Sequence, residues 1–145
     1  MAREDLRLRE RTISLREEHL RHAVVLADTS ALLARLPKGG VVAEVGVAEG
    51  NFSASILATT APTTLHLIDL WGSSVERFGS AGFERVAARF SAEIASGRVM
   101  VHRGLSWDML ATLEDRSLDW AYVDAAHDYD SVRRDLAALL PKLKP

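Results

Sequence analysis

The chain contains no cysteine, and it has little that would mark a secreted, membrane-bound or nucleic-acid-binding protein. Without cysteine there is no disulfide, no thiolate metal site and no cysteine nucleophile. No apolar run approaches the ~18 residues of a membrane-spanning helix, and the charged start, residues 1–5, is not a secretory signal. A formal net charge of −2 provides no basic field for nucleic acid. We therefore expect a cytoplasmic protein with neither a membrane nor a nucleic-acid partner.

A length of 145 residues fits one folded domain, preceded here by a helical extension. Residues 1–37 are rich in charge, and from Leu15 onward many of their apolar positions fall at helical spacing. Ser14 and Glu17 have the spacing of a capping box. We expect residues 1–37 to form a solvated helix packed on the domain of residues 38–145. The alternative is a lid over a ligand or an arm of a homodimer.

Strand-like and helix-like segments alternate after this extension. The expected strands are 41–46, 64–70, 98–103 and 118–124, and the expected helices are 51–59, 74–96 with a break near Gly79–Gly82, 106–113 and 130–140. The strands are apolar on both faces, which is typical of a parallel sheet with helices on both sides. The pattern predicts an α/β doubly wound fold, and we expect the strand order 3-2-1-4 within it. An open apolar edge at 118–124 suggests that further strands, or a partner, complete the sheet.

A glycine turn follows the first strand, in the pattern Glu44-x-Gly46-x-x-x-Gly50. Glycine tolerates positive φ and lets the backbone approach a ligand closely. Dinucleotide sites prefer Gly-x-Gly-x-x-Gly, which this turn does not have, and that counts against NAD. Asp69 ends the next strand, where a carboxylate can accept hydrogen bonds from both hydroxyls of a ribose. Its alternative is a turn or helix-cap aspartate. Together these residues predict a nucleoside-cofactor site.

Two further segments border the same predicted site. Trp71 can pack on the nucleoside, or it can be a core tryptophan. After the third strand, Gly104 and Ser106 can border an adenine ring, although Ser106 can also simply cap the following helix.

The fourth strand carries an aspartate at its carboxyl end, Asp124, with His127 one short turn later. The first and fourth strands flank the topological switch point, where ligands bind in open α/β sheets. Asp124 there can bind a hard cation or the cationic end of a cofactor. His127 can take the proton of a substrate hydroxyl, because the unperturbed pKa of histidine is near 6.5. The alternative for His127 is a solvent-facing turn residue.

These motifs resemble those of the class I S-adenosylmethionine-dependent methyltransferases, over about residues 38–145. Residues 42–50 look like the family's first motif, and Asp69 looks like its ribose-binding acid. Residues 118–129, with Pro141-Lys-Leu-Lys-Pro145 after them, are similar to small-molecule O-methyltransferases of the caffeoyl-CoA, catechol and natural-product sugar type. In the caffeoyl-CoA type the residue matching Asp124 binds a divalent metal, and a lysine stands where this chain has His127. The later strand with further metal ligands is absent here.

The resemblance implies a Rossmann-like sheet and methyl transfer from S-adenosylmethionine to a small-molecule hydroxyl, with Mg²⁺ on Asp124 as a further expectation. Asp124 and His127 are the expected catalytic residues. The expected cofactor-binding residues are Glu44, Gly46, Val47, Gly50, Asn51, Phe52, Asp69, Leu70, Trp71, Gly104, Leu105, Ser106 and Asp124. Two alternatives stay open: an NAD-dependent oxidoreductase, and a truncated, non-catalytic binding module.

Overall fold

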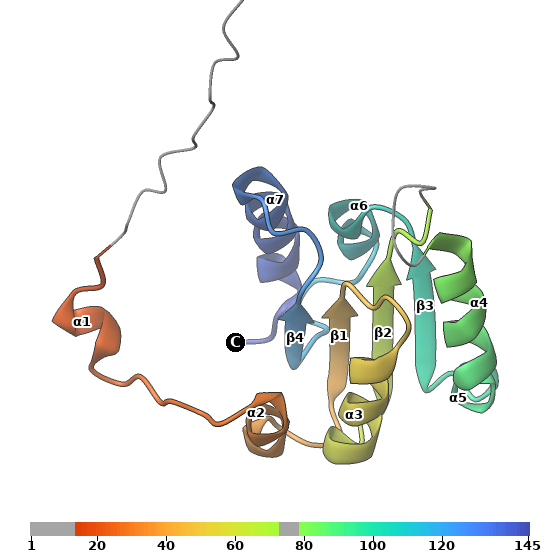
Figure 1. Cartoon of the computed structure of the whole chain (residues 1–145), viewed down its shortest axis with the longest axis horizontal. Helices are drawn as coiled ribbons and strands as arrows, with labels where there is room; N and C mark the ends of the chain where they lie inside the picture. The colour runs from red at the N-terminus through yellow and green to blue at the C-terminus, as the bar shows by residue number, and fades with distance from the viewer. Residues whose placement is uncertain (1–13, 73–78) are drawn as a thin grey trace, which may run out of the picture.

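The computed structural model describes residues 14–72 and 79–145, and its centre is a four-stranded parallel sheet (Figure 1). The strands are β1 (Val41–Val45), β2 (Thr64–Asp69), β3 (Val99–Arg103) and β4 (Trp120–Val123). Their order across the sheet is β3-β2-β1-β4, with every neighbouring pair parallel. The predicted α/β fold and strand order are therefore confirmed.

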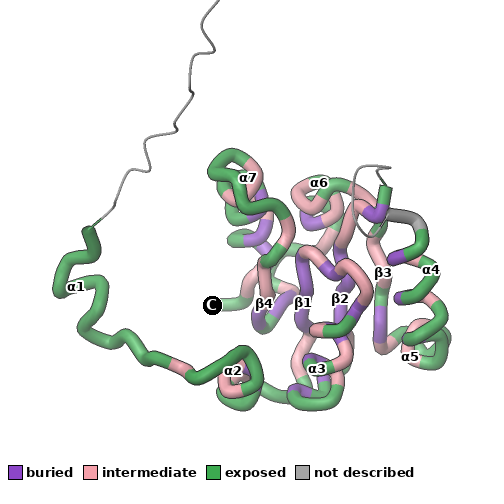
Figure 2. Tube along the Cα trace, in the orientation of Figure 1, coloured by how far each residue is buried: buried purple, intermediate pink, exposed green. Residues whose placement is uncertain are grey.

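Helices cover both faces of the sheet, because both faces are apolar. The helices of the described residues are α1 (Glu17–Leu20), which lies apart from the sheet, α2 (Thr29–Arg35), α3 (Asn51–Thr60), α4 (Gly79–Arg89), α5 (Ser91–Ala95), α6 (Ser106–Ala111) and α7 (Tyr129–Leu139), followed by a 3₁₀ turn, η1 (Leu140–Lys142). One core cluster joins α2, α3 and α4 to the sheet, through residues such as Leu33, Ile56 and Val86. A second cluster joins α6 and α7 to the opposite face, through Leu110 and Leu139. Figure 2 shows the buried residues concentrated along the strands and on the helix faces that meet them.

The described part of the N-terminal extension differs from the expected continuous helix. It contains two short helices, α1 and α2, separated by non-helical residues, and every residue from 14 to 25 is exposed. The expected capping box is wrong, because α1 is capped by Arg16 rather than Ser14. A helix as short as α1 gains little without a packed face, and no residue of α1 is buried. Figure 1 shows α1 standing apart from the sheet, whereas α2 packs through Leu33.

The expected helix over 74–96 lies partly outside the described residues, as does the chain just before Gly79; its described part runs unbroken through Gly82 and breaks at Phe90, where no break was predicted. Helix α4 contains Gly82 as a buried residue, and the chain turns at Phe90 before α5 begins. Phe90 has φ −108° and ψ 24°, and its side chain is buried in the first core cluster. The position of the break therefore follows from burial of an aromatic ring, and glycine content alone did not reveal it.

The free edge of β4 is partly covered by the C-terminal residues. Leu118 and Leu143 form a parallel bridge, in which the Leu118 N–H donates to the carbonyl of Lys142 and the Lys144 N–H donates to the carbonyl of Leu118, both at 2.9 Å. The Lys142 ammonium fixes this segment by donating to Asp115 at 2.7 Å. Among the helices of the described residues, none has the length and apolarity needed to cross a membrane.

Candidate cofactor site

A cavity of about 730 Å³ opens at the carboxyl ends of β1, β2 and β4. Eleven of the predicted cofactor-binding residues line it: Glu44, Gly46, Val47, Asn51, Phe52, Asp69, Leu70, Trp71, Leu105, Ser106 and Asp124. The structure leaves three predicted residues out of the lining: Gly50, Gly104 and His127. The predicted site thus forms one continuous cavity, and His127, the predicted base, lies outside its lining next to Asp124.

Glycine in the turn after β1 is required by close packing against the protein itself. Gly46 has φ +92°, and a Cβ added there would lie 2.2 Å from the carbonyl oxygen of Asp124. Gly50 has φ +75°, and its added Cβ would lie 2.7 Å from the ring of Phe90. Because glycine alone combines positive φ with this space requirement, the turn can pass between β4 and α4. Both glycines therefore shape the cavity, Gly46 as part of its lining and Gly50 from outside the lining.

Asp69 fixes this turn through backbone hydrogen bonds. Its Oδ2 accepts from the N–H groups of Val47 and Ala48 at 2.8 and 2.9 Å, and its Oδ1 accepts from the Trp71 N–H at 3.0 Å. The last contact is a local turn of the kind aspartate favours. Oδ1 accepts only this one bond in the described structure, so the carboxylate retains capacity for a ligand donor on the cavity side.

Trp71 belongs to the core and to the cavity wall at the same time. Its side chain is 1% exposed, its ring meets Phe83 edge-on, and its Nε1 donates to the Ala48 carbonyl at 2.9 Å. Its backbone has φ +37°, a strained value for a large side chain. The hydrogen bonds of Asp69 and Trp71 together hold the glycine turn against β2. Strain of this kind occurs where surrounding contacts fix the backbone, as they do at this site.

Glu44 is the most buried acid of the cavity wall. It is 1% exposed and accepts a hydrogen bond from the hydroxyl of Ser53 on α3. Burial raises the pKa of Glu44 to about 7; the Ser53 hydrogen bond opposes this shift, and the nearby carboxylates of Asp69 and Asp124 add to it. Burial, with Asp124 and Glu44 nearby, also raises the pKa of Tyr122.

The cavity is electrostatically one-sided. Four carboxylates line it, those of Glu44, Glu49, Asp69 and Asp124, while none of the lining residues within the described ranges is lysine, arginine or histidine. Glu49 has an ion-pair partner, Arg85 at 2.8 Å, which lies outside the lining. Charges on low-dielectric walls focus their field into the cavity. The site therefore favours a ligand that brings positive charge.

Ser106 does not cap α6 as the alternative expected. Leu105 is the N-cap residue, and the Ser106 hydroxyl donates instead to Oδ1 of Asp135 on α7 at 2.5 Å. Asp135 is 0% exposed. The hydroxyl of this cavity-lining residue thus donates to a carboxylate from another helix.

Asp124 and His127 form a pair at the rim. His127 Nε2 lies 3.0 Å from Asp124 Oδ1, with side-chain exposures of 79% and 55%. In the neutral tautomer whose Nε2–H group donates a hydrogen bond to Asp124, the other ring nitrogen, Nδ1, has the lone pair that can accept a proton. The pair can therefore accept a proton from a molecule that reaches the cavity mouth.

The residues present do not fit the expected magnesium site. Among residues 14–72 and 79–145, no group of three or more His, Cys, Asp or Glu side chains is arranged to hold a metal ion. Mg²⁺ requires near-octahedral oxygen coordination, and one oxygen of Asp124 is already bonded to His127.

Sequence reasoning missed eight of the lining residues. They are Ala48, Glu49, Ile68, Trp107, Tyr122, Ala125, Ala126 and Ser131. Ala48 and Glu49 lie inside the predicted glycine turn, and Tyr122 lies two positions before Asp124 on the predicted strand 118–124, so adjacency could have indicated them. Ser131 comes from α7, and no local pattern places that helix at the cavity.

Residues 43–145 match the family model described as "Methyltransferase domain". Among solved structures, the chain is similar to a candidate sarcosine dimethylglycine methyltransferase from Galdieria sulphuraria, with TM-score 0.59 and 14% identity, over 79% of this chain and 40% of that one. It is similar to a candidate methyltransferase from Streptococcus mutans in complex with SAH, with TM-score 0.56 and 10% identity, over 80% and 64% of the two chains. Spermidine synthase from Thermotoga maritima aligns with TM-score 0.53 and 14% identity, over 77% and 36%.

The curated protein sequences include no match to this chain. The chain spans less than two thirds of the length of each of these three solved proteins, and at these identities the likeness establishes the fold alone. The family match extends over more than half of the 145 residues and includes β2, β3, β4 and most of β1. On that match, and with a cavity at the switch point of its sheet, the chain belongs to the methyltransferase-domain family.

Proposed function

We propose that this chain binds S-adenosylmethionine in the cavity and transfers its methyl group to a hydroxyl oxygen of a small molecule. The observation that carries the proposal is the charge of the cavity: four acidic side chains and no cationic one among its described lining residues, even with Glu44 partly protonated near pH 7 and Glu49 paired with Arg85. S-adenosylmethionine has a sulfonium and an ammonium group against a single carboxylate, so its net charge complements these walls. NAD would bring an anionic pyrophosphate to the same walls, and it is disfavoured for that reason.

The wall residues suggest how the nucleoside lies. The free acceptor capacity of Asp69 Oδ1 suits a ribose hydroxyl, in agreement with the role expected from the sequence. Glu44 and the turn after β1 lie on one side of Asp69, next to β4, and suit the cationic amino-acid part. Leu105 and Ser106 follow β3 on the other side and suit the nucleobase.

The rim pair supplies the proton chemistry in this proposal. The bound cofactor supplies an electrophilic methyl group, which passes to the acceptor oxygen as the carbon–sulfur bond breaks. Asp124 orients the ring of His127, and Nδ1 receives the proton that the hydroxyl loses as the new carbon–oxygen bond forms. The products are a methyl ether and S-adenosylhomocysteine. The chain contributes mainly alignment, which can be worth ~7–11 kcal/mol.

The first test is binding. We expect S-adenosylhomocysteine to raise the melting temperature and NAD to leave it unchanged. At 100 times its dissociation constant, a ligand adds about 2.7 kcal/mol to the free energy of unfolding, which is readily measured. Stabilisation by NAD alone would favour the oxidoreductase alternative.

The second test concerns the acceptor. Matched small aromatic acceptors that differ only in a hydroxyl, amine or thiol group are incubated with S-adenosylmethionine, and formation of S-adenosylhomocysteine is measured. Turnover with the hydroxyl series alone supports the proposal, whereas turnover with amines alone contradicts it. Binding without turnover on any acceptor favours the non-catalytic module.

A further inference from the structure

We infer that Asp135 is a positioning residue for nucleobase recognition, which it achieves by taking the one proton of the Ser106 hydroxyl. Ser106 then presents only lone pairs to the cavity, and it selects a ligand that offers an N–H group there. The inference rests on the proposed function, because it concerns the nucleobase end of the same cavity.

The geometry of the pair fixes the direction of the Ser106 hydroxyl. A serine hydroxyl has one proton and two lone pairs. That proton is directed at Asp135 Oδ1, 2.5 Å away, while Ser106 itself lines the cavity. Asp135 stands one helical turn after Ser131, which also lines the cavity, so α7 reaches this end of the site from behind. What the hydroxyl of Ser106 then offers a ligand is an acceptor.

The Ser106–Asp135 hydrogen bond leaves the second oxygen of a buried carboxylate without a partner, which is unfavourable if the contact serves stability alone. Asp135 is 0% exposed, and its Oδ2 has no hydrogen-bond partner in the described structure. A buried acceptor without a partner destabilises a fold, and such a group calls for an explanation. Helices α6 and α7 also share a core cluster through Leu110 and Leu139, so this hydrogen bond is not the only contact that joins them. A role in fixing the Ser106 proton explains why a carboxylate is kept there.

The position of Ser106 indicates which part of the ligand it meets. The sheet order places the turn after β1, then Asp69 after β2, then Leu105 and Ser106 after β3. With the ribose at Asp69, the nucleobase extends toward Ser106. Adenine offers an exocyclic amine, a donor that matches a lone pair. Hypoxanthine has a carbonyl oxygen at the same place, which would face the Ser106 lone pairs without a proton between them.

The experiment compares the affinities for S-adenosylhomocysteine and S-inosylhomocysteine by titration calorimetry. In the wild-type chain we expect the adenosyl compound to bind about 10- to 100-fold more tightly, the range for one mismatched buried hydrogen bond. In Asp135→Asn the side-chain amide can donate to Ser106, whose proton then becomes available to the cavity. We expect this variant to lose most of that preference. Asp130→Asn, an exposed change on the same helix, should retain the wild-type ratio.

The ratio of the two affinities separates positioning from general structural damage, which would weaken both ligands alike. Ser106→Ala provides the same test without altering Asp135, and it too should lose the preference. An unchanged ratio in both Asp135→Asn and Ser106→Ala would overturn the inference, as would equal affinities in the wild-type chain, and both results would leave the proposed function standing. If neither nucleoside binds the wild-type chain, the proposed function and the inference both fail.

Discussion

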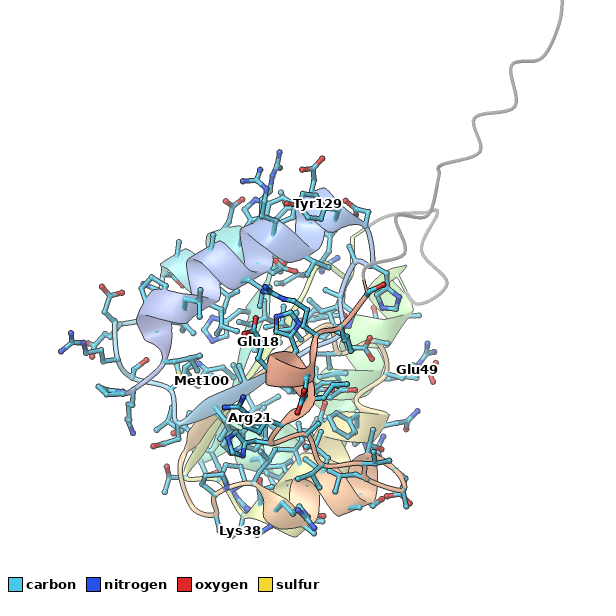
Figure 3. The ribbon with its side chains drawn as sticks, turned by 90° about the vertical axis from the view of Figure 1, so that its left-hand side faces the viewer. Glu18, Arg21, Lys38, Glu49, Met100 and Tyr129 are labelled. Carbon is cyan, nitrogen blue, oxygen red and sulfur yellow. The ribbon has the colours of Figure 1, made fainter. Side chains whose placement is uncertain are left out.

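The inner wall of the cavity and its rim both use carboxylates with hydrogen-bonding partners, but those of the wall are buried or half-buried and the one at the rim is exposed to solvent. At the wall, Glu44 is 1% exposed and Asp69 accepts three backbone N–H groups. At the rim, Asp124 and His127 bond to each other, with more than half of each side chain exposed. The wall carboxylates are therefore part of the hydrogen-bonded fold. The side chains of the rim pair are positioned mainly by the hydrogen bond between them. In the side view of Figure 3, Tyr129, at the start of α7 just after the rim, likewise projects outward.

This difference predicts that wall substitutions reduce both stability and binding, while rim substitutions reduce turnover alone. Residues buried among obligatory hydrogen-bond partners cannot be changed without leaving some of those partners unsatisfied. Exposed side chains can be changed with little effect on the free energy of unfolding.

The largest effect is expected at the junction of wall and rim. Gly46→Ala places a Cβ 2.2 Å from the Asp124 carbonyl oxygen at φ +92°, so we expect a loss of about 3 kcal/mol or more in the free energy of unfolding. Gly39→Ala is the matched control, since φ is +72° there and no atom lies within 4 Å. It should lose only about 1–2 kcal/mol. Chemical denaturation measures both, and equal losses would show that the contact with Asp124 is not what requires glycine.

The rim prediction is a large change in rate with little change in stability. His127→Ala removes the proposed base and should lower turnover about 10²–10⁴-fold. The free energy of unfolding should stay within about 0.5 kcal/mol of the wild type. Affinity for S-adenosylhomocysteine should also be retained, because His127 does not line the cavity. Parallel losses of affinity and turnover would contradict the assignment of His127 as the base.

A matched pair of aspartates compares wall and rim directly. Asp69→Asn turns an N–H group toward backbone donors and should cost about 1–3 kcal/mol of stability. We also expect it to weaken S-adenosylhomocysteine binding at least tenfold, by about 1.4 kcal/mol. Asp124→Asn makes the same chemical change at the rim, and it should leave stability within about 0.5 kcal/mol of the wild type. If Asp124→Asn destabilises as much as Asp69→Asn, the distinction between wall and rim is wrong.

The smallest effect is a dependence on pH that belongs to the wall. The pKa of Glu44 rises from 4.5 to about 7 on folding, so the folded chain binds the extra proton and stability is lost as pH rises through about 7. Burial lowers the pKa of His66 from 6.5 to about 4 and also lowers the pKa of His102, and both shifts give the opposite slope over an overlapping pH range. Both histidines are unchanged in Glu44→Gln, so the difference between the two stability profiles isolates the Glu44 slope, at most about 1.4 kcal/mol per pH unit. Measured by thermal or chemical unfolding, the stability of the wild type relative to Glu44→Gln should fall as pH rises from about 4.5 to 7, and parallel profiles would contradict the assignment.

The sequence alone was sufficient for the architecture of the sheet and, to within one residue, for the carboxyl ends of its strands. The apolar runs indicate strands that are buried on both faces of a sheet. Chain connectivity then allows very few strand orders, so the order β3-β2-β1-β4 could be predicted. The carboxyl ends of parallel strands lie at one edge of a sheet, so strand order by itself predicts that Gly46, Asp69 and Asp124 share one site.

Only the tertiary structure decided the partners of those residues. The bonds from Val47 and Ala48 to Asp69, from Ser53 to Glu44, and from Ser106 to Asp135 depend on how helices and turns pack after their crossovers. The helix break at Phe90 and the separation of α1 from the sheet were also decided by the tertiary structure, because local helix propensity is weak compared with tertiary packing. Periodicity in the sequence records which side chains are buried, whereas the partner of a buried polar group is set by distances across the fold.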